Sequence, residues 1–327
     1  MRTDNRAIVI GCGVNGLTCA IKLQELGIEV EIWTRDRPER TVSMVAASVW
    51  HPYLVFPEDR VARWATSSFE AFAWLATEPD TGIWLAEGVV ITPEPVKRPT
   101  WAIHAMDVRC IEASPNLPAH YTLCAPIIET PTYIPWLLNR FEQGGGAVVD
   151  REVASFDEPF ERARVVINCA GLGARTLARD VLVRPVKGQI VRLAAGAFDR
   201  FLFDERDPAV PTYMIPRRGD CILGGTAEPG ADDTGTSESA QRSIIERCAR
   251  LVPSIADAEV LGSIAGVRPA RDEVRLEPEI IEGRGLLVHN YGHGGAGITL
   301  SIGCADEVKS IVAMAIEAPT REKSGRG

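Results

Sequence analysis

Three glycines near the N-terminus have the spacing of a phosphate-binding loop. Gly11, Gly13 and Gly16 follow an apolar run at 7–10, and Asp36 comes 20 residues after the last of them. The first glycine permits a tight turn, the second lets the backbone approach a pyrophosphate, and the third allows close helix packing. The helix N-terminus then directs unpaired N–H groups at the phosphates. This pattern predicts a bound dinucleotide, NAD or FAD, against the simpler alternative of a tight turn without a ligand.

A second glycine-rich turn lies near the C-terminus, between a predicted strand at 286–289 and a predicted helix at 298–315. It contains four glycines, which are Gly292, Gly294, Gly295 and Gly297. Such a turn indicates that the backbone passes close to a flat or bulky group, or that several residues adopt positive φ. For His289 and His293 we expect hydrogen bonding within the turn and core, rather than metal ligation or general-base catalysis.

The segment from Val288 to Ala305 resembles the signature of the D-amino-acid oxidase family, in which it wraps the isoalloxazine ring of FAD. Five further segments match this family in type and order: 45–52, 168–171, 185–189, 213–216 and 266–271. The resemblance therefore covers nearly the whole chain and favours FAD over NAD, because a nicotinamide-dependent dehydrogenase has no use for the C-terminal glycine turn.

The resemblance implies a set of FAD-binding residues spread along the chain. They are Gly11, Gly13, Val14, Asn15, Gly16, Arg35, Asp36, Ser43, Ala46, Ala47, Ser48, Val153, Ala170, Gly294, Gly295, Ala296, Gly297, Ile298 and Thr299. Asp36 is the expected ribose contact, although Arg35 and Asp36 lie slightly past the predicted strand, where solvated surface charge is the alternative. No metal ligand is predicted.

Arg268 is the first candidate for catalysis, since it stands in the segment that resembles the family's G-x-R-P loop. A guanidinium offers two parallel donors to a carboxylate and fixes its orientation. In the family, this arginine and a tyrosine, here Tyr213, direct the substrate Cα–H at flavin N5, and no protein base is needed. We predict Arg268, Tyr213 and Gly295 as catalytic and substrate-binding, with His51 and Ile215 as further substrate contacts. A surface ion pair for the arginine and core packing for the tyrosine are the alternatives.

Two departures from the family pattern bear on the substrate. Ala209 stands where animal members carry a lid tyrosine, and the stretch 204–211 is short, so a long closing lid is not expected. Ala227 stands where D-aspartate oxidases carry a basic residue. Arg217 and Arg218 are expected to be solvated in a turn. The sequence therefore predicts neutral D-amino acids as substrates, since a buried acidic side chain would lack a partner.

The elements that position these residues follow from hydrophobic periodicity. Predicted strands at 7–10 and 28–33 flank one helix that is closed by Gly27, which is a βαβ unit with a parallel sheet. Short runs typical of antiparallel strands occur at 88–92, 189–193, 213–215 and 221–223. We expect a mixed α/β chain: a Rossmann-like FAD-binding domain formed by 1–54, 140–182 and 278–327, and a second domain with its own antiparallel sheet, for substrate, formed by 55–139 and 183–277.

Composition excludes several classes of protein. The chain has 327 residues, 46% hydrophobic, with 35 Lys+Arg against 44 Asp+Glu and a net charge of −9. Disorder and nucleic-acid binding are therefore disfavoured. No stretch is typical of a signal peptide or a membrane span, the last four residues do not form a peroxisomal signal, and the eight cysteines form no CxxC pair. We expect a cytoplasmic enzyme, and a homodimer stays open.

The activity that the resemblance implies is oxidative deamination. A D-amino acid, oxygen and water give a 2-oxo acid, ammonia and hydrogen peroxide. D-aspartate oxidase and a glycine- or sarcosine-type oxidase are alternatives within the class, and a non-catalytic flavin-binding protein is the alternative outside it. Such a binding protein would not need Arg268 and Tyr213 together.

Overall fold

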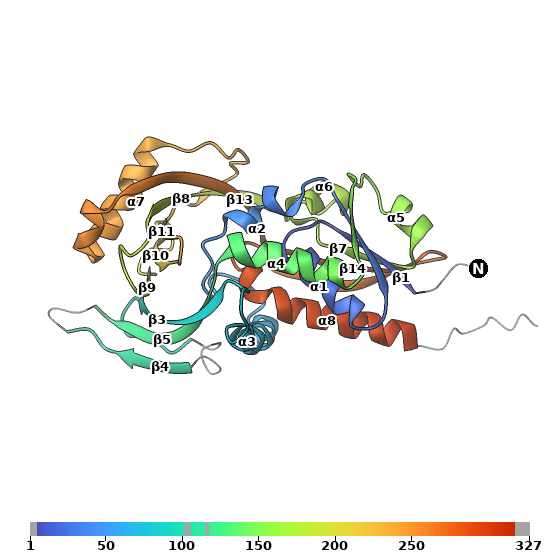
Figure 1. The fold of residues 1–327 in the computed structure, drawn as a ribbon, viewed down its shortest axis with the longest axis horizontal. Coiled ribbons are helices and arrows are strands. Elements are labelled where there is room, and N and C mark those ends of the chain that lie inside the picture. Colours follow the sequence, from blue (N-terminus) through green and yellow to red (C-terminus); the bar gives the residue numbers. More distant parts are fainter. Residues whose placement is uncertain (1–4, 100, 102–105, 115–117, 318–327) are drawn as a thin grey trace, which may run out of the picture.

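The structure is a computed structural model that describes residues 5–99, 101, 106–114 and 118–317. Its described strands form one 14-stranded sheet in the order β4-β5-β3-β9-β10-β11-β8-β13-β14-β7-β1-β2-β6, with β12 added on β8. Figure 1 shows the antiparallel strands at one end of the long axis and the parallel strands at the other. The mixed α/β class expected from the sequence is confirmed.

The parallel half consists of five strands. These are β1 (Arg6–Ile10), β2 (Glu29–Thr34), β6 (Ala147–Asp150), β7 (Val165–Asn168) and β14 (Gly285–His293). Successive residues of β1 face opposite sides, as strand geometry requires. Ala7 and Val9 join the core that contains helices α1 (Val14–Gln24) and α8 (Gly297–Glu317), whereas Ile8 and Ile10 pack with Phe160 of α5 (Asp157–Arg162). Both faces of this half are therefore covered, as in a nucleotide-binding domain.

The antiparallel half carries eight further strands of the described sheet. They are β3 (Ile83–Ile91), β4 (Met106–Ile111), β5 (His120–Ile128), β8 (Arg184–Ala194), β9 (Phe201–Asp204), β10 (Thr212–Pro216), β11 (Asp220–Gly224) and the two-residue β12 (Glu228–Pro229). One pair, β3 with β9, is parallel. Met214 and Leu223 pack under helix α7 (Glu238–Leu251), which leaves Tyr213 and Ile215 on the opposite face.

Strand β13 (Val260–Ile281) joins the two halves and corrects two expectations. It pairs with β8 over its first part and with β14 over its second, so the expected antiparallel sheet is continuous with the parallel one. The segment 266–271, expected as a loop, lies inside this strand. Likewise β14 continues to His293, so the glycine-rich turn is shorter than the sequence suggested.

Helices not expected from the sequence cover the remaining surfaces. Helix α3 (Glu58–Leu75) packs on α8, and α4 (Thr130–Gln143) packs on α1. Short helical turns complete the chain: η1 (Pro38–Arg40), α2 (Val42–Val45), η3 (Gly171–Gly173), α6 (Ala174–Leu177) and η4 (Pro253–Asp257). Within the described ranges, no helix is both long enough and apolar enough to cross a membrane.

Candidate functional site

The N-terminal glycines have three different physical roles. Gly11 has φ +100°, and a Cβ there would lie 2.5 Å from the carbonyl oxygen of Cys169. A Cβ on Gly16 would overlap the carbonyl oxygen of Gly11, so this glycine permits the close helix–strand packing. At Gly13 a Cβ would meet only Ser43 Oγ, at 3.1 Å. The fold therefore requires the outer two glycines, while the space beside Gly13 is open for a ligand to approach the backbone.

The N-termini of α1 and α8 lie side by side at this loop. A Cβ on Gly297 would lie 3.4 Å from Asn15 Nδ2, and the backbone N–H of Val14 donates to Ser43 Oγ at 3.0 Å. The first N–H groups of each helix lack intrahelical acceptors and favour an anion. Asn15 Oδ1 is buried and accepts no hydrogen bond from the described residues. The N–H groups of the two helix ends are donors that fit a pyrophosphate, whereas the Asn15 oxygen is an acceptor and would need a donor from elsewhere in the ligand.

The loop after β2 closes over the same helix ends. Thr130 Oγ1 donates to the carbonyl oxygens of Met44 and Ala46, at 3.1 and 2.9 Å, and so holds the segment that contains Ala47 and Ser48. Ser48 adopts φ +54°. On the α8 side, the backbone N–H of His51 donates to Thr299 Oγ1 at 3.3 Å. The segments predicted to contact FAD therefore lie together, although they are distant in sequence.

The predicted contacts at the far end of the nucleotide are less closely grouped. Val153 packs in the cluster that contains Trp33 and Ala170. Arg35 Nε donates to Asp36 Oδ2 at 2.8 Å, and the Arg35 side chain is 67% exposed. This exposed ion pair is compatible with either role predicted for Asp36, a ribose contact or a solvated surface charge.

Arg268, Tyr213 and Gly295 meet at the junction of the two halves. Glycines of neighbouring strands provide the room: a Cβ on Gly188 would overlap the Arg268 guanidinium, and one on Gly224 would overlap the Tyr213 ring. A Cβ on Gly295 would lie 3.8 Å from Arg268 Cδ. Arg268 Nη1 donates to the carbonyl oxygen of Thr226 at 3.2 Å, which leaves most of its N–H groups available to another acceptor.

The phenol of Tyr213 stays protonated at neutral pH. Burial raises its pKa, and the adjacent Arg268 guanidinium opposes that rise by favouring the phenolate. The hydroxyl would lie 3.1 Å from a Cβ on Gly225. Tyr213 is thus a neutral donor beside a cationic donor, a combination suited to holding a carboxylate.

A row of rings extends from Tyr213 and ends at an acid that sequence reasoning missed. Phe203 lies 5.8 Å from the Tyr213 ring and stacks on His51, with ring centroids 4.7 Å apart. His51 Nε2 contacts Glu205 Oε1 at 2.5 Å. Ile215 lies on the same face of β10 as Tyr213, and its side chain is buried. The only signal for Glu205 was its place in the short 204–211 stretch, because its partner is distant in sequence.

The turn between β10 and β11 contradicts one expectation. Arg217 is not solvated: it is 9% exposed and pairs with Asp220, Nε to Oδ1 at 2.6 Å and Nη2 to Oδ2 at 2.7 Å. Asp220 also accepts from Arg192 Nε at 2.6 Å. Closing the hairpin therefore buries the arginine against a carboxylate partner. Arg218 is exposed, as expected, and lies over the Trp84 ring. The short connection between β9 and β10, expected from the sequence, is confirmed.

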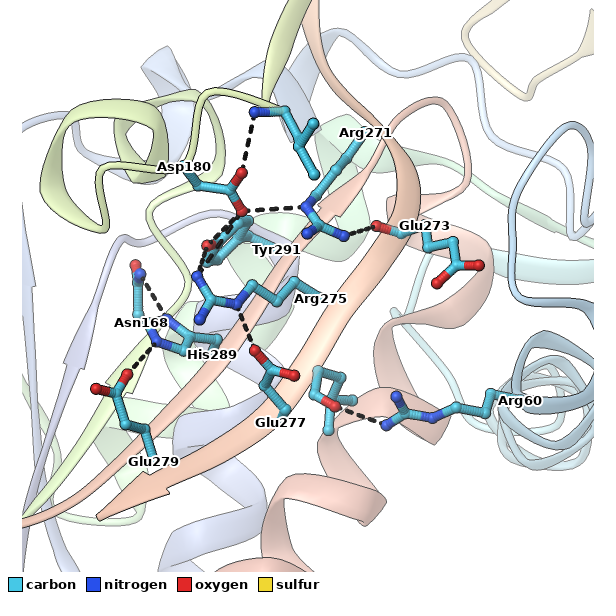
Figure 2. Close-up of polar contacts among 12 residues, drawn as sticks. Arg60, Asn168, Asp180, Arg271, Glu273, Arg275, Glu277, Glu279, His289 and Tyr291 are labelled. Carbon is cyan, nitrogen blue, oxygen red and sulfur yellow. Dashed lines mark hydrogen bonds and ion pairs between the residues drawn. The ribbon is translucent and has the colours of Figure 1, made fainter. Parts of the chain in front are cut away.

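The two histidines of the C-terminal segment are both buried. His289 Nδ1 accepts from Asn168 Nδ2 at 3.2 Å, and its Nε2 lies 3.3 Å from Glu279 Oε2, so its expected hydrogen bonding is confirmed (Figure 2). His293 differs, since its Nε2 has no hydrogen-bond partner among the described residues. Burial lowers the pKa of His289, and it lowers that of His293 to about 4.

Comparison with known proteins gives consistent matches over nearly the whole chain. The family model described as FAD dependent oxidoreductase (DAO) matches residues 6–311. A D-amino-acid oxidase of Rubrobacter xylanophilus is 46% identical over 319 residues, covering 96% of this chain and 98% of that protein. One of Streptomyces coelicolor is 41% identical, covering 93% and 95%. A Homo sapiens D-aspartate oxidase is 31% identical, covering 96% of both.

Solved structures share the fold at lower identity. Glycine oxidase from Geobacillus kaustophilus superimposes with a TM-score of 0.78 at 21% identity, covering 95% of both chains. L-proline dehydrogenase from P. horikoshii gives a TM-score of 0.81 at 14% identity, covering 96% of this chain and 94% of that one. At these identities the likeness concerns the fold alone.

Proposed function

The chain belongs to the family of FAD-dependent oxidoreductases described as DAO, and within it we propose a D-amino-acid oxidase that acts on neutral D-amino acids. The observation that carries this proposal is the meeting of Arg268, Tyr213 and Gly295 beside the N-termini of α1 and α8. A site that only bound a flavin would not need a guanidinium and a neutral phenol side by side.

The residues of the chain divide the work of binding and orientation. The N-termini of α1 and α8, with the backbone at Gly13, would hold the pyrophosphate, and the turn at 294–297 would lie against the flavin ring. Bound FAD supplies the two-electron oxidation, with oxygen as the final acceptor. We assign the FAD-binding part to 1–54, 140–182 and 278–327 and the substrate part to 55–139 and 183–277. The boundaries at 140 and 278 fall inside α4 and β13, which serve both parts.

Substrate orientation is the task of Arg268 and Tyr213. The guanidinium pairs with the substrate carboxylate, and the neutral phenol donates a second hydrogen bond to it. Holding the carboxylate at two points fixes the direction of the Cα–H bond, and such positioning supplies much of the rate enhancement in reactions of this kind. His51 and Ile215 would then lie along the substrate side chain.

Two observations support neutral over acidic side chains. Arg217, which is buried in the β10–β11 turn, already has both of its contacting N–H groups engaged by Asp220. Glu205 adds a carboxylate next to His51, which disfavours a second carboxylate there. These observations argue against D-aspartate as the preferred substrate. A cytoplasmic location and a homodimer remain predictions from the sequence.

A peroxide assay with a panel of D-amino acids tests the proposal directly. The purified protein should be yellow, with flavin absorbance, and should release peroxide with D-alanine but not with L-alanine. A colourless protein would favour a nicotinamide enzyme, and a yellow protein inactive across the panel would favour a flavin-binding module. Either result would overturn the assignment.

A further inference from the structure

Strand β13 is irregular immediately after Arg268. Ala270 pairs with His293, and the next paired residue, Arg275, stands opposite Tyr291. The residues 271–274 therefore bulge out opposite the single residue Gly292, and such bulges redirect the side chains next to them. The backbone N–H of Gly294 donates to the carbonyl oxygen of Pro269 at 3.0 Å, so the bulge lies next to the contact between Arg268 and the glycine turn.

One buried carboxylate holds this bulge (Figure 2). Asp180 is 8% exposed, and its Oδ2 accepts from Tyr291 Oη at 2.9 Å and from Arg271 Nε at 3.1 Å. Its Oδ1 accepts from the backbone N–H of Leu182 at 3.0 Å. Arg275 Nη1 is 3.8 Å from the same Oδ2. Asp180 thus ties three points of the β13–β14 pair to the segment that follows α6.

The partners of Asp180 also contact other residues of the bulge and of β14. Arg271 Nη1 donates to the carbonyl oxygen of Glu273 at 2.8 Å, and a Cβ on Gly292 would come within 2.9 Å of Arg271 Cβ. Arg275 Nη1 donates to Tyr291 Oη at 2.7 Å, so that hydroxyl both accepts and donates. Without the carboxylate, Arg271 would lose its ion-pair partner, whereas Arg275 would keep Glu277, whose Oε1 lies 2.7 Å from its Nε. A partly buried charge left without a partner rearranges or takes up water.

We propose that Asp180 is a positioning residue for substrate: acting through Arg271 and Tyr291, it fixes the β13 bulge and thereby the place of Arg268 relative to Gly295. The proposal rests on the proposed function of Arg268. It differs from a purely stabilising role, because it requires that loss of Asp180 weakens carboxylate binding even in variants that stay folded with FAD bound.

The test uses Asp180→Asn, which keeps the size of the side chain and removes its charge, in the yellow holoenzyme. We expect the KM for D-alanine to rise about tenfold or more, with a smaller change in kcat, because a small displacement of a binding group is costly. Inhibition by propionate, a carboxylate without an amino group, should weaken by the same factor. FAD content should match that of the wild type. Tyr291→Phe should give a smaller shift in the same direction, and serves if Asp180→Asn does not fold.

Asp157→Asn is the matched control, because Asp157 pairs with Arg284 in the exposed turn at the other end of the same two strands. It should change neither the KM nor the propionate inhibition. If Asp180→Asn or Tyr291→Phe loses thermal stability but keeps the wild-type KM and propionate affinity, the positioning role is wrong and only stabilisation is left. If the wild type itself releases no peroxide with any D-amino acid, the proposed function fails, and this inference fails with it.

Discussion

The guanidinium of Arg268 lies so close to the backbone of Gly188 that a single methyl group on Gly188 would overlap its Nη1 atom. The two residues are on neighbouring strands, where Gly188 pairs with Gly266 and Arg268 with Val186. β8 therefore provides the surface on which the arginine rests. Arg268 can occupy this position only because residue 188 has no side chain.

Gly188→Ala should lower activity without releasing the cofactor. The added methyl group displaces the guanidinium, and we expect kcat/KM for D-alanine to fall by roughly 10- to 100-fold, since misplaced catalytic groups lose about this much. FAD absorbance per protein should be unchanged. Gly219→Ala is the control, because a Cβ there meets nothing closer than Glu129 Oε1 at 3.9 Å. Equal activity of both variants would show that Arg268 need not lie where it does.

Arg268→Ala should lose most activity and still bind FAD. Removing a bidentate, charge-assisted contact costs about 3 kcal/mol, on the order of 100-fold in kcat/KM. Arg268→Lys should be intermediate, because lysine keeps the charge but not the two parallel donors. Steady-state kinetics with D-alanine measure the effect. A near-normal kcat/KM of Arg268→Ala would show that Arg268 does not bind the substrate.

Gly13→Val should purify as a folded, colourless protein. In the structure only Ser43 Oγ stands near a Cβ at this position, so the side chain would fill the space left for pyrophosphate rather than disrupt the core. The ratio of flavin to protein absorbance and the circular dichroism spectrum measure the two properties separately. Gly16→Val, which would strike the Gly11 carbonyl, should instead fail to fold. Stoichiometric FAD in Gly13→Val would mean that the loop is only a structural turn.

Acid should destabilise the protein partly through His293. Burial lowers its pKa from 6.5 to about 4, so between these values the unfolded state binds a proton that the native state does not. The stability from neutral burial is fully present above pH 6.5 and is lost as the pH falls to 4, a change of about 3 kcal/mol. Unfolding of the wild type and His293→Gln, measured from pH 7 to 4, should show a shallower decline in the variant. Parallel curves would contradict this origin.

D-aspartate and D-glutamate should be poorer substrates than D-alanine by at least about tenfold in kcat/KM, which corresponds to about 1.4 kcal/mol. An acidic side chain loses water and finds Arg217 already paired with Asp220. Side-by-side assays at constant ionic strength measure the ratio. Should D-aspartate prove the best substrate, an unidentified cation must line the pocket.

The sequence predicted those parts of the molecule whose signals are local. Both glycine turns, the first βαβ unit and the amphipathic α8 follow from spacing within about 30 residues. Helix α4 was hidden by Pro131 and Pro135, which argue against a helix although the first lies in its opening turn and the second inside it. Strand β13 was hidden because Gly266 and Pro269 interrupt its apolar pattern.

Site residues could be predicted where a sequence motif requires a particular residue type. They could not be predicted where a partner that only folding brings into contact determines whether a side chain is buried or paired. Arg268 and Tyr213 were identified from their motifs, and the structure brings them together. Arg217 was expected in solvent because turns usually carry solvated charge, and only the folded hairpin shows that Asp220 covers it. Glu205 gained significance solely from its contact with His51, which lies on a different element far along the chain.

The sharing of β13 has a consequence for how the molecule unfolds. Its first part completes the antiparallel strands at β8, and its second part completes the parallel strands at β14. Peeling this one strand away would expose the ladder edges of both halves at once, and unpaired buried backbone is costly on each side. We therefore expect the two halves to unfold as one cooperative unit. Heat or denaturant should therefore give one transition, in which the antiparallel strands lose their pairing together with the parallel ones.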